Sequence, residues 1–372
     1  MTRQQPDTRF TRALGVISGT SMDGIDVAFV ETDGDAHVAP GAGASYPYPA
    51  ALRAQLQAVV SDAERAQHAP LEALEREVTD AHCAAVSRFM RAQGLASGDI
   101  DLVGLHGQTI FHKPQARFTR QLLDGARAAR LLGIDVVNRF RHADVATGGE
   151  GAPFVPLYHQ ALAAKLETPL MVLNWGGVGN VTYLSDSPPL AFDTGPANAL
   201  IDDWVLRHFG ESYDADGAIC ASGKVDRAIV AALMDNPYFD RKPPKSLDRN
   251  EFHRRAAIVE TLSPQDGAAT LAAFTIEATA AALRHVQSPP RCWLVCGGGR
   301  LNRFLMQGLA ARLGVPVEPV ETVGWNGDYL EAQCFAWLAM RSRKGLPLSL
   351  PSTTNVPAPM PGGVFHPAAR PA

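Results

Sequence analysis

The sequence predicts an α/β protein made of two related domains. The chain has 372 residues, more than one compact core usually holds, and two domains of roughly 150 to 200 residues each are typical of that length. Apolar, strand-like runs alternate with segments of helical spacing. Two glycine-rich turns, each between two apolar runs, lie about half the chain apart, and such a repeat indicates a duplicated architecture.

The first of these hairpins covers residues 14–30. Two β-branched runs flank a turn of glycines, small hydroxyls and two carboxylates. Gly19 and Gly24 allow backbone angles that other residues resist, and a turn without bulky side chains can direct several N–H groups at one anion. We interpret it as a phosphate-binding turn. A plain surface hairpin is the alternative, because short glycine-rich motifs also match by chance.

A helix and two strands follow. Residues 70–90 carry apolar side chains at helical spacing. Strands are expected at 101–105 and 134–137, followed by the polar segments 106–109 and 138–144. In layered α/β folds, polar residues just beyond strand ends line the ligand crevice.

We place the boundary between the domains at the glycines and proline of 148–153. The first α/β domain, with the first hairpin, is then 1–150. The second, 151–343, holds the second hairpin. The proline-rich residues 344–372 lack periodicity and are expected to form an extended strap over the surface.

The second hairpin, residues 170–184, is followed by Asp193 and then by an amphipathic helix that stops at Gly210. We expect Pro196 in the first helical turn, so that Asp193 sits at the positive end of the helix, which would keep it ionised and attract phosphate. An ionised carboxylate can accept a proton from water or a hydroxyl. Alternatively, Asp193 only caps the helix.

Near the C-terminus, a buried strand at 292–296 runs into three glycines and a helix capped by Asn302. A tight strand-to-helix turn needs one or two glycines, and the third favours a flat ligand such as a nucleotide close to the backbone. Asp328 and Glu331 have the spacing of a capping box, so Glu331 has a simple structural interpretation beside a functional one.

Composition and charge exclude several classes of protein. The net charge of −4, without a dense Lys or Arg run, gives no basic field for nucleic acid. No apolar run approaches the ~20 residues that span a bilayer, and the polar first ten residues have no signal core behind them. The five scattered cysteines indicate reduced thiols. We therefore expect a cytoplasmic protein.

No residue is assigned as a metal ligand from the sequence. His106, His112 and His142 follow no metal-ligand spacing and are interpreted as hydrogen-bonding wall residues. Asp214 and Asp216 could reach magnesium through waters or form an Asx-type turn, and we favour the turn.

Six short blocks occur in order between Leu14 and about Pro367. They are residues 19–26, 106–109, 174–180, 193–196, 296–299 and 327–332. Together they resemble the anhydro-N-acetylmuramic acid kinase family, and six blocks in register are far more specific than any one. The resemblance implies two duplicated α/β domains of the actin, Hsp70 and hexokinase type around a nucleotide cleft.

The resemblance also implies a reaction. ATP, with Mg²⁺, would convert 1,6-anhydro-N-acetylmuramic acid to N-acetylmuramic acid 6-phosphate and ADP, in peptidoglycan recycling. The expected partner is this small amino sugar, with neither nucleic acid nor a membrane, and a homodimer is left open. Two alternatives are an ordinary sugar kinase of the same fold without ring opening and a chaperone-like, nucleotide-dependent binding protein.

By the same resemblance, Asp193 would be the catalytic base. The sugar pocket would include His106, Arg141, Asp144 and Glu331. The ATP phosphates would bind the first turn, at Gly19, Thr20, Ser21, Met22, Asp23, Gly24, Ile25 and Asp26, and the second hairpin, at Asn174, Gly176, Gly177, Gly179 and Asn180. The adenosine would be flanked by Gly297, Gly298 and Gly299.

Overall fold

The computed structural model describes residues 10–19, 22–247 and 251–368. The chain forms two compact units. Unit 1 consists of Met1–Ala164 and Tyr329–Ala372, and unit 2 is Lys165–Asp328. Each unit has a hydrophobic core of its own.

The units do not begin and end where the sequence led us to expect. Residues 151–164 lie in unit 1, where the Gly151 N–H donates to Asp144. The helix at 330–343 also lies in unit 1, because it packs against that unit's sheet. Local composition could not show either association, since both depend on contacts between residues far apart in the sequence.

The sheet of unit 1 has the strand order β12-β6-β4-β1-β2-β3, with β5 beside β4. The strands are β1 (Thr11–Ser18), β2 (Ile25–Thr32), β3 (Val38–Tyr46), β4 (Leu102–Lys113), β5 (Phe118–Leu122), β6 (Asp135–Asn138) and β12 (Val364–His366). β1 and β2 form the expected first hairpin. β4 is longer than expected because β5 pairs with its second half, so residues 106–109 lie inside the strand and not beyond its end.

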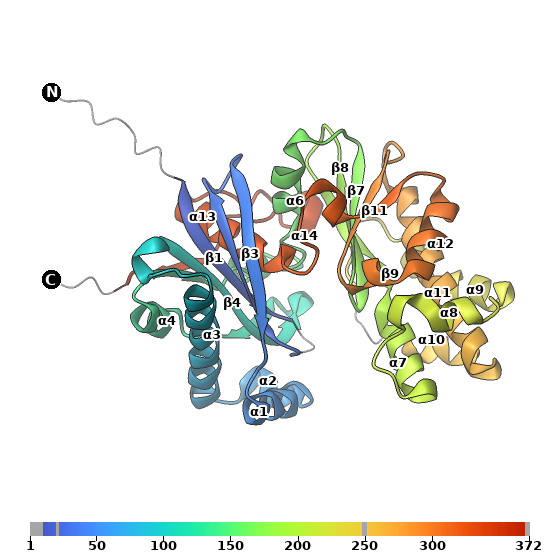
Figure 1. The fold of residues 1–372 in the computed structure, drawn as a ribbon, viewed down its shortest axis with the longest axis horizontal. Coiled ribbons are helices and arrows are strands. Elements are labelled where there is room, and N and C mark those ends of the chain that lie inside the picture. The colour runs from blue at the N-terminus through green and yellow to red at the C-terminus, as the bar shows by residue number, and fades with distance from the viewer. Residues whose placement is uncertain (1–9, 20–21, 248–250, 369–372) are drawn as a thin grey trace. The chain divides into compact units, whose positions relative to one another are not determined.

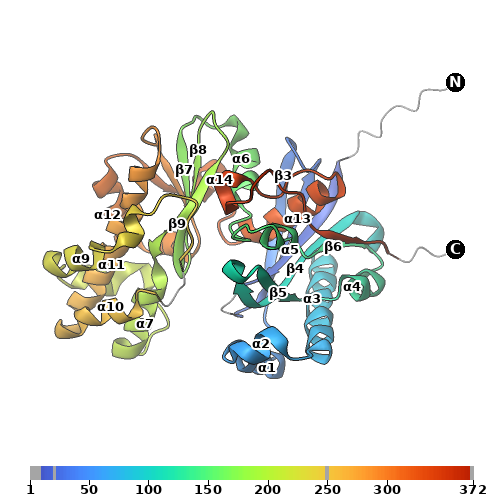
Figure 2. The same cartoon turned by 180° about the vertical axis from the view of Figure 1, so that it is seen from behind.

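Helices cover the sheet of unit 1 (Figures 1 and 2). They are α1 (Ala50–Val60), α2 (Ala63–His68), α3 (Glu72–Ala92), α4 (Gly125–Leu132), α5 (His142–Ala146), α6 (Pro156–Leu162), α13 (Leu330–Arg343) and α14 (Pro351–Thr354). α3 confirms the helix expected at 70–90 and contacts β2 and β4. α13 contacts β1, β2 and β4.

Two glycines let α13 approach the sheet closely. Gly15 of β1 and Gly104 of β4 are register partners on neighbouring strands. A Cβ at Gly15 would lie 1.8 Å from the Ala332 carbonyl oxygen, and one at Gly104 would lie 2.1 Å from that of Phe335. Successive residues of a strand point to opposite faces, so the neighbours of Gly15 enter the core on the other face, beside α3.

The C-terminal segment runs over unit 1. It carries the short helix α14, a bridge between Ser349 and Met360, and β12, which pairs antiparallel with β6. In the part of the chain that the structure describes, no helix combines the length and apolar character needed to cross a membrane.

The sheet of unit 2 has the order β11-β10-β7-β8-β9. Its strands are β7 (Leu170–Trp175), β8 (Val178–Leu184), β9 (Leu190–Pro196), β10 (Trp293–Cys296) and β11 (Val317–Pro319). In unit 1, β1, β2 and β3 are antiparallel neighbours, and β4 and then β6 add in parallel on the other side of β1. In unit 2, β7, β8 and β9 are antiparallel neighbours, and β10 and then β11 add in parallel on the other side of β7. This repeated topology confirms the duplicated α/β architecture.

The helices of unit 2 pack around α11, as Figure 1 shows. They are α7 (Asn198–Phe209), α8 (Ala218–Ser222), α9 (Arg227–Met234), α10 (His253–Ala256), α11 (Pro264–Ala280) and α12 (Arg303–Leu313). α7 ends at Gly210, whose left-handed backbone (φ 75°) caps it as expected. Asn302 caps α12 by accepting a hydrogen bond from the Leu305 N–H, which is also as expected.

Candidate active site

The first glycine-rich turn begins where β1 ends. The Met22 N–H donates to the Gly19 carbonyl (3.1 Å), and Met22 itself has a left-handed backbone (φ 58°). Gly24 does not, so the expectation of an unusual angle there is wrong. A glycine is favoured at position 24 for a steric reason instead, because a Cβ there would lie 2.6 Å from the Ser45 hydroxyl. Thr20 and Ser21, also expected at this turn, lie outside the described residues.

A buried glutamine holds the start of this turn. The Gln108 side-chain oxygen accepts hydrogen bonds from the hydroxyls of Ser18 (2.7 Å) and Tyr48 (3.1 Å), and its amide donates to the Gly19 carbonyl (3.2 Å). Burial raises the pKa of Tyr48, so it stays a neutral donor. Charged residues of the turn face outward, where Asp23 pairs with Arg53 (2.9 Å). Ile25 is buried and begins β2, and Asp26 follows it in that strand.

His106 and Arg141, both expected in the sugar pocket, are in direct contact. Arg141 Nε donates to His106 Nε2 (2.8 Å), which requires that the proton of His106 be on Nδ1, where it donates to the Gly107 carbonyl (2.8 Å). Burial, and then the charge of Arg141, lower the pKa of His106 well below its usual value. His106 is therefore neutral and oriented, and Arg141 carries the charge.

Asp144, also expected in the pocket, uses its carboxylate within the protein. Oδ1 accepts from the Gly151 N–H (2.7 Å), and Oδ2 accepts from Thr354 (2.6 Å) and Ser349. The Gly151 carbonyl in turn accepts from Arg141 (2.5 Å). Asp144 is buried, so its carboxylate is not exposed to solvent. It holds the Gly151 backbone, whose carbonyl in turn binds Arg141.

Glu331 does not form the capping box that its spacing suggested. Helix α13 begins at Leu330, its N-cap is Tyr329, and no side chain caps it. Asp328 pairs instead with Arg300 (2.8 Å). The Glu331 side chain is solvent-accessible. Desolvation by surrounding protein, and then Asp26, raise its pKa, whereas Arg141 lowers it. Glu331 thus lies within electrostatic reach of Arg141.

In unit 2 the second turn, Gly176-Gly177, accepts the first amides of α7. The Asn198 N–H donates to the Gly176 carbonyl (3.0 Å), and those of Ala197 and Ala199 donate to Gly177. These three amides are therefore hydrogen-bonded within the protein, and the attraction of phosphate to this helix end stays a prediction. Pro196 is the last residue of β9, not part of the first helical turn.

Asp193 lies within β9, directly opposite Asn180 of β8. Partners in register share a sheet face, so the carboxylate lies on the same face as the Asn180 side chain. Its Oδ2 accepts from the Leu247 N–H (2.8 Å). The capping alternative is wrong, because the N-cap of α7 is Ala197 and has no side-chain cap.

The three glycines after β10 differ in whether the surrounding structure requires a glycine at their position. A Cβ at Gly297 (φ 75°) would lie 2.3 Å from Asn174 Oδ1, and one at Gly299 would lie 2.5 Å from Trp175 Cβ. Both are therefore required by packing against β7. Gly298 is exposed, and among the described residues a Cβ there would have only the Asn198 side-chain amide within 4 Å, so packing does not require a glycine at this position.

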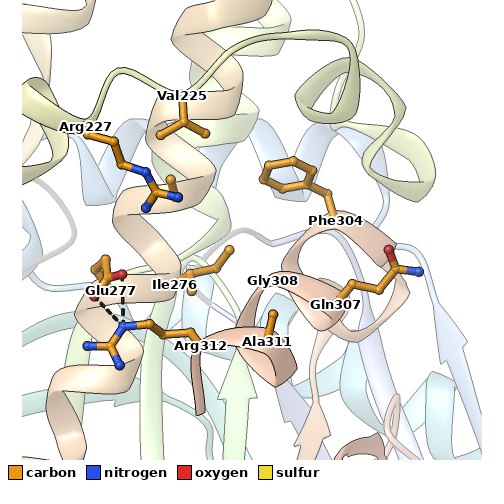
Figure 3. A pocket seen from close by; sticks show the side chains of 10 residues that line it. Val225, Arg227, Ile276, Glu277, Phe304, Gln307, Gly308, Ala311 and Arg312 are labelled. Carbon is orange, nitrogen blue, oxygen red and sulfur yellow. Dashed lines mark hydrogen bonds and ion pairs between the residues drawn. The ribbon is translucent and has the colours of Figure 1, made fainter. Parts of the chain in front are cut away.

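A cavity of about 530 Å³ lies elsewhere in unit 2, between α11 and α12 (Figure 3). Ile276, Phe304 and Gly308 form much of its apolar lining, and the Glu277–Arg312 ion pair lies at its rim. None of the residues that the sequence predicted for the site lines this cavity, so it is not the predicted site.

The Asx-type turn expected at Asp214 and Asp216 is not what their carboxylates form. Asp214 accepts from the N–H groups of Ile219 and Cys220, and Asp216 pairs with Arg303. Across the described ranges, no three His, Cys, Asp or Glu side chains gather as a metal site.

Comparison with known proteins decides the family. The family model for anhydro-N-acetylmuramic acid kinase matches residues 11–368. The chain belongs to the anhydro-N-acetylmuramic acid kinase family. Proteins of that name from Rhizorhabdus wittichii and Paramagnetospirillum magneticum are 51% identical over 361 residues and 52% identical over 356 residues. Both alignments cover 95% of this chain, and 98% and 99% of the relatives.

A solved structure supports the fold of this anhydro-N-acetylmuramic acid kinase family member. Component A of (R)-2-hydroxyglutaryl-CoA dehydratase from Acidaminococcus fermentans superimposes with a TM-score of 0.50 at 10% identity, over 90% of this chain and 99% of that one. With the repeated sheet order, this establishes two duplicated α/β domains of the actin, Hsp70 and hexokinase type.

Sequence reasoning missed several residues that support the site. Gln108 was recognised only as part of a block, and Tyr238, Lys245 and Leu247 were not considered, although all three bind Asp193 or its neighbours. None of these three residues belongs to one of the six blocks, and no local pattern shows what they contact.

Proposed function

We propose that this chain is an ATP-dependent kinase that opens 1,6-anhydro-N-acetylmuramic acid with water and phosphorylates its O6. The products are N-acetylmuramic acid 6-phosphate and ADP, in peptidoglycan recycling. The observation that carries the proposal is the Asp193 carboxylate, fixed by the Leu247 N–H beside the second glycine-rich turn, in a chain 51% to 52% identical to kinases of that name.

One carboxylate suffices for this reaction. A water oxygen bonds to C1 and gives a proton to Asp193, while the C1–O6 bond breaks. O6 bonds to the γ-phosphorus of ATP, whose bond to the β-phosphate oxygen breaks to release ADP. Ordinary glycosidases need a second carboxylic acid to protonate the departing oxygen, whereas here the phosphoryl group takes that place.

ATP enters as its Mg²⁺ complex. We assign the phosphates to backbone amides of the two glycine-rich turns and the adenosine to the exposed backbone at Gly298. Mg²⁺ binds mainly through phosphates and water in such sites.

The sugar would meet Arg141, His106 and Glu331 in unit 1. N-acetylmuramic acid carries a carboxylate, and the Arg141 guanidinium, held by His106 and Gly151, is a suitable partner for it. Asp144 would act by keeping Gly151 in place. We place the reaction in the cytoplasm because it consumes ATP and because the described cysteines are free thiols.

The test is ADP formation by the purified chain with MgATP, with and without the anhydro sugar. We expect ADP and N-acetylmuramic acid 6-phosphate in equal amounts with the sugar, and negligible ADP without it. Glucose and N-acetylglucosamine serve as control substrates. ATP hydrolysis that is independent of the sugar, or equally fast phosphorylation of the control sugars, would contradict the proposal.

A further inference from the structure

Lys245 is a buried cation without an ion-pair partner at hydrogen-bond distance among the described residues. Only 5% of the residue is exposed. Its ammonium donates to the carbonyls of Tyr238 (2.9 Å) and Phe239 (3.3 Å), lies 3.4 Å from His285 Nε2, and sits 4.6 Å from the centre of the Tyr238 ring. Such a group costs desolvation energy, so its position calls for a role.

The segment 238–247, which contains Lys245, forms hydrogen bonds with three groups of Asp193: its carbonyl, its N–H and its carboxylate. The Tyr238 hydroxyl donates to the Asp193 carbonyl (2.6 Å). The Asp193 N–H donates to the Lys245 carbonyl (3.0 Å). The Leu247 N–H, two residues further, donates to the Asp193 carboxylate (2.8 Å).

We propose that Lys245 is a positioning residue for Asp193. Its ammonium ties residue 245 back to 238 and 239, and this closure fixes both Tyr238 and the 245–247 backbone against β9. The carboxylate then has one orientation, set by the Leu247 amide. Misplacement of a reacting group by about 1 Å can cost about 100-fold in rate, so loosening this segment would act on the chemical step. The inference rests on Asp193 being the base.

Both positive and negative side chains near Lys245 affect its pKa. The pKa of Lys245 is lowered to about 8, chiefly by burial; Arg241 and Arg284 also lower it, whereas Asp240 and Asp193 raise it. His285 has a lowered pKa because of burial, and burial raises the pKa of Tyr238, so both neighbours are neutral. The ammonium form is therefore retained at neutral pH, where it can donate to both carbonyls.

The test compares Lys245→Met with Lys242→Met, which removes an exposed lysine of the same segment. For Lys245→Met we expect kcat to fall about 10- to 100-fold, with KM for ATP and sugar within about threefold of wild type. Lys242→Met should match wild type, and Lys245→Arg, which keeps the charge and donors, should recover part of the loss. Nucleotide binding by each variant, measured by fluorescence, reports that it is folded.

Unchanged kcat in folded Lys245→Met would overturn the inference, and so would a loss seen only as raised KM. If Lys245→Met does not fold, Lys245→Gln replaces it, with the same two outcomes. Wild type is assayed in parallel: if it fails to phosphorylate the anhydro sugar, the proposed function fails, whereas an active wild type with an equally active Lys245→Met removes only the role of Lys245.

Discussion

Asp193→Asn is expected to lower kcat by about two to four orders of magnitude while leaving ATP affinity unchanged, since general-base catalysis contributes about that much. Asn is nearly the same size and retains an oxygen that can accept from the Leu247 N–H. The substitution therefore removes the proton acceptor without changing the shape of β9. Turnover is measured as sugar-dependent ADP formation, and ATP affinity by equilibrium binding.

Asp186→Asn is the matched control, because it neutralises an exposed aspartate in the loop before β9. It should behave as wild type. Near-normal turnover of Asp193→Asn would remove Asp193 from the mechanism, and weakened ATP binding would show instead that it holds nucleotide.

Gly15→Ala is expected to destabilise the protein severely. The new Cβ would lie 1.8 Å from the Ala332 carbonyl oxygen and 2.4 Å from the Ala336 nitrogen, both backbone atoms of α13 that cannot rotate away. Overpacking usually costs about 1 to 3 kcal/mol, and with backbone on both sides we expect at least about 3 kcal/mol by that scale. Urea unfolding followed by circular dichroism measures it.

Gly98→Ala provides the comparison, since a Cβ at Gly98 would meet no described atom within 4 Å. It should leave the unfolding midpoint nearly unchanged. Equal midpoints for Gly15→Ala and Gly98→Ala would show that α13 is not seated on β1 as described. The position of α13 matters for function because this helix carries Glu331, while β1 leads into the first turn and β4 carries His106.

The hairpins were predictable because their signal is local. Two apolar runs around a glycine-rich turn specify strand, turn and strand without help from the rest of the chain, and both hairpins form as expected. The helix ending at Gly210 and the cap at Asn302 are local in the same way. Their accuracy follows from short-range steric and hydrogen-bonding preferences.

Most of what the sequence did not show concerns contacts between segments apart in the chain, whereas the error at Glu331 is local. The sequence did not show that carbonyls of the second turn accept the amides of Ala197, Asn198 and Ala199 at the start of α7. Glu331 has the spacing of a cap, yet α13 begins one residue before it. The seating of α13 on Gly15 joins residues more than 300 apart in the sequence, and no local pattern contains it.

The candidate site was predictable mainly through the six blocks taken together. The resemblance that they carry led to His106 and Arg141, and in the structure Arg141 Nε lies 2.8 Å from His106 Nε2. They did not reveal that Asp144 is occupied by Gly151, Ser349 and Thr354, because hydroxyls from the C-terminal segment carry no recognisable motif. The assignment of these residues to sugar binding stays a prediction.

The proposed reaction requires that water attack C1 while O6 receives the phosphoryl group. The most direct test runs the reaction in water enriched in heavy oxygen and locates the label in the product by mass spectrometry. We predict one labelled oxygen at C1 of N-acetylmuramic acid 6-phosphate for each ADP formed, with none in the phosphate. A phosphorylated sugar that keeps its anhydro ring, or labelled phosphate in place of labelled sugar, would contradict this mechanism.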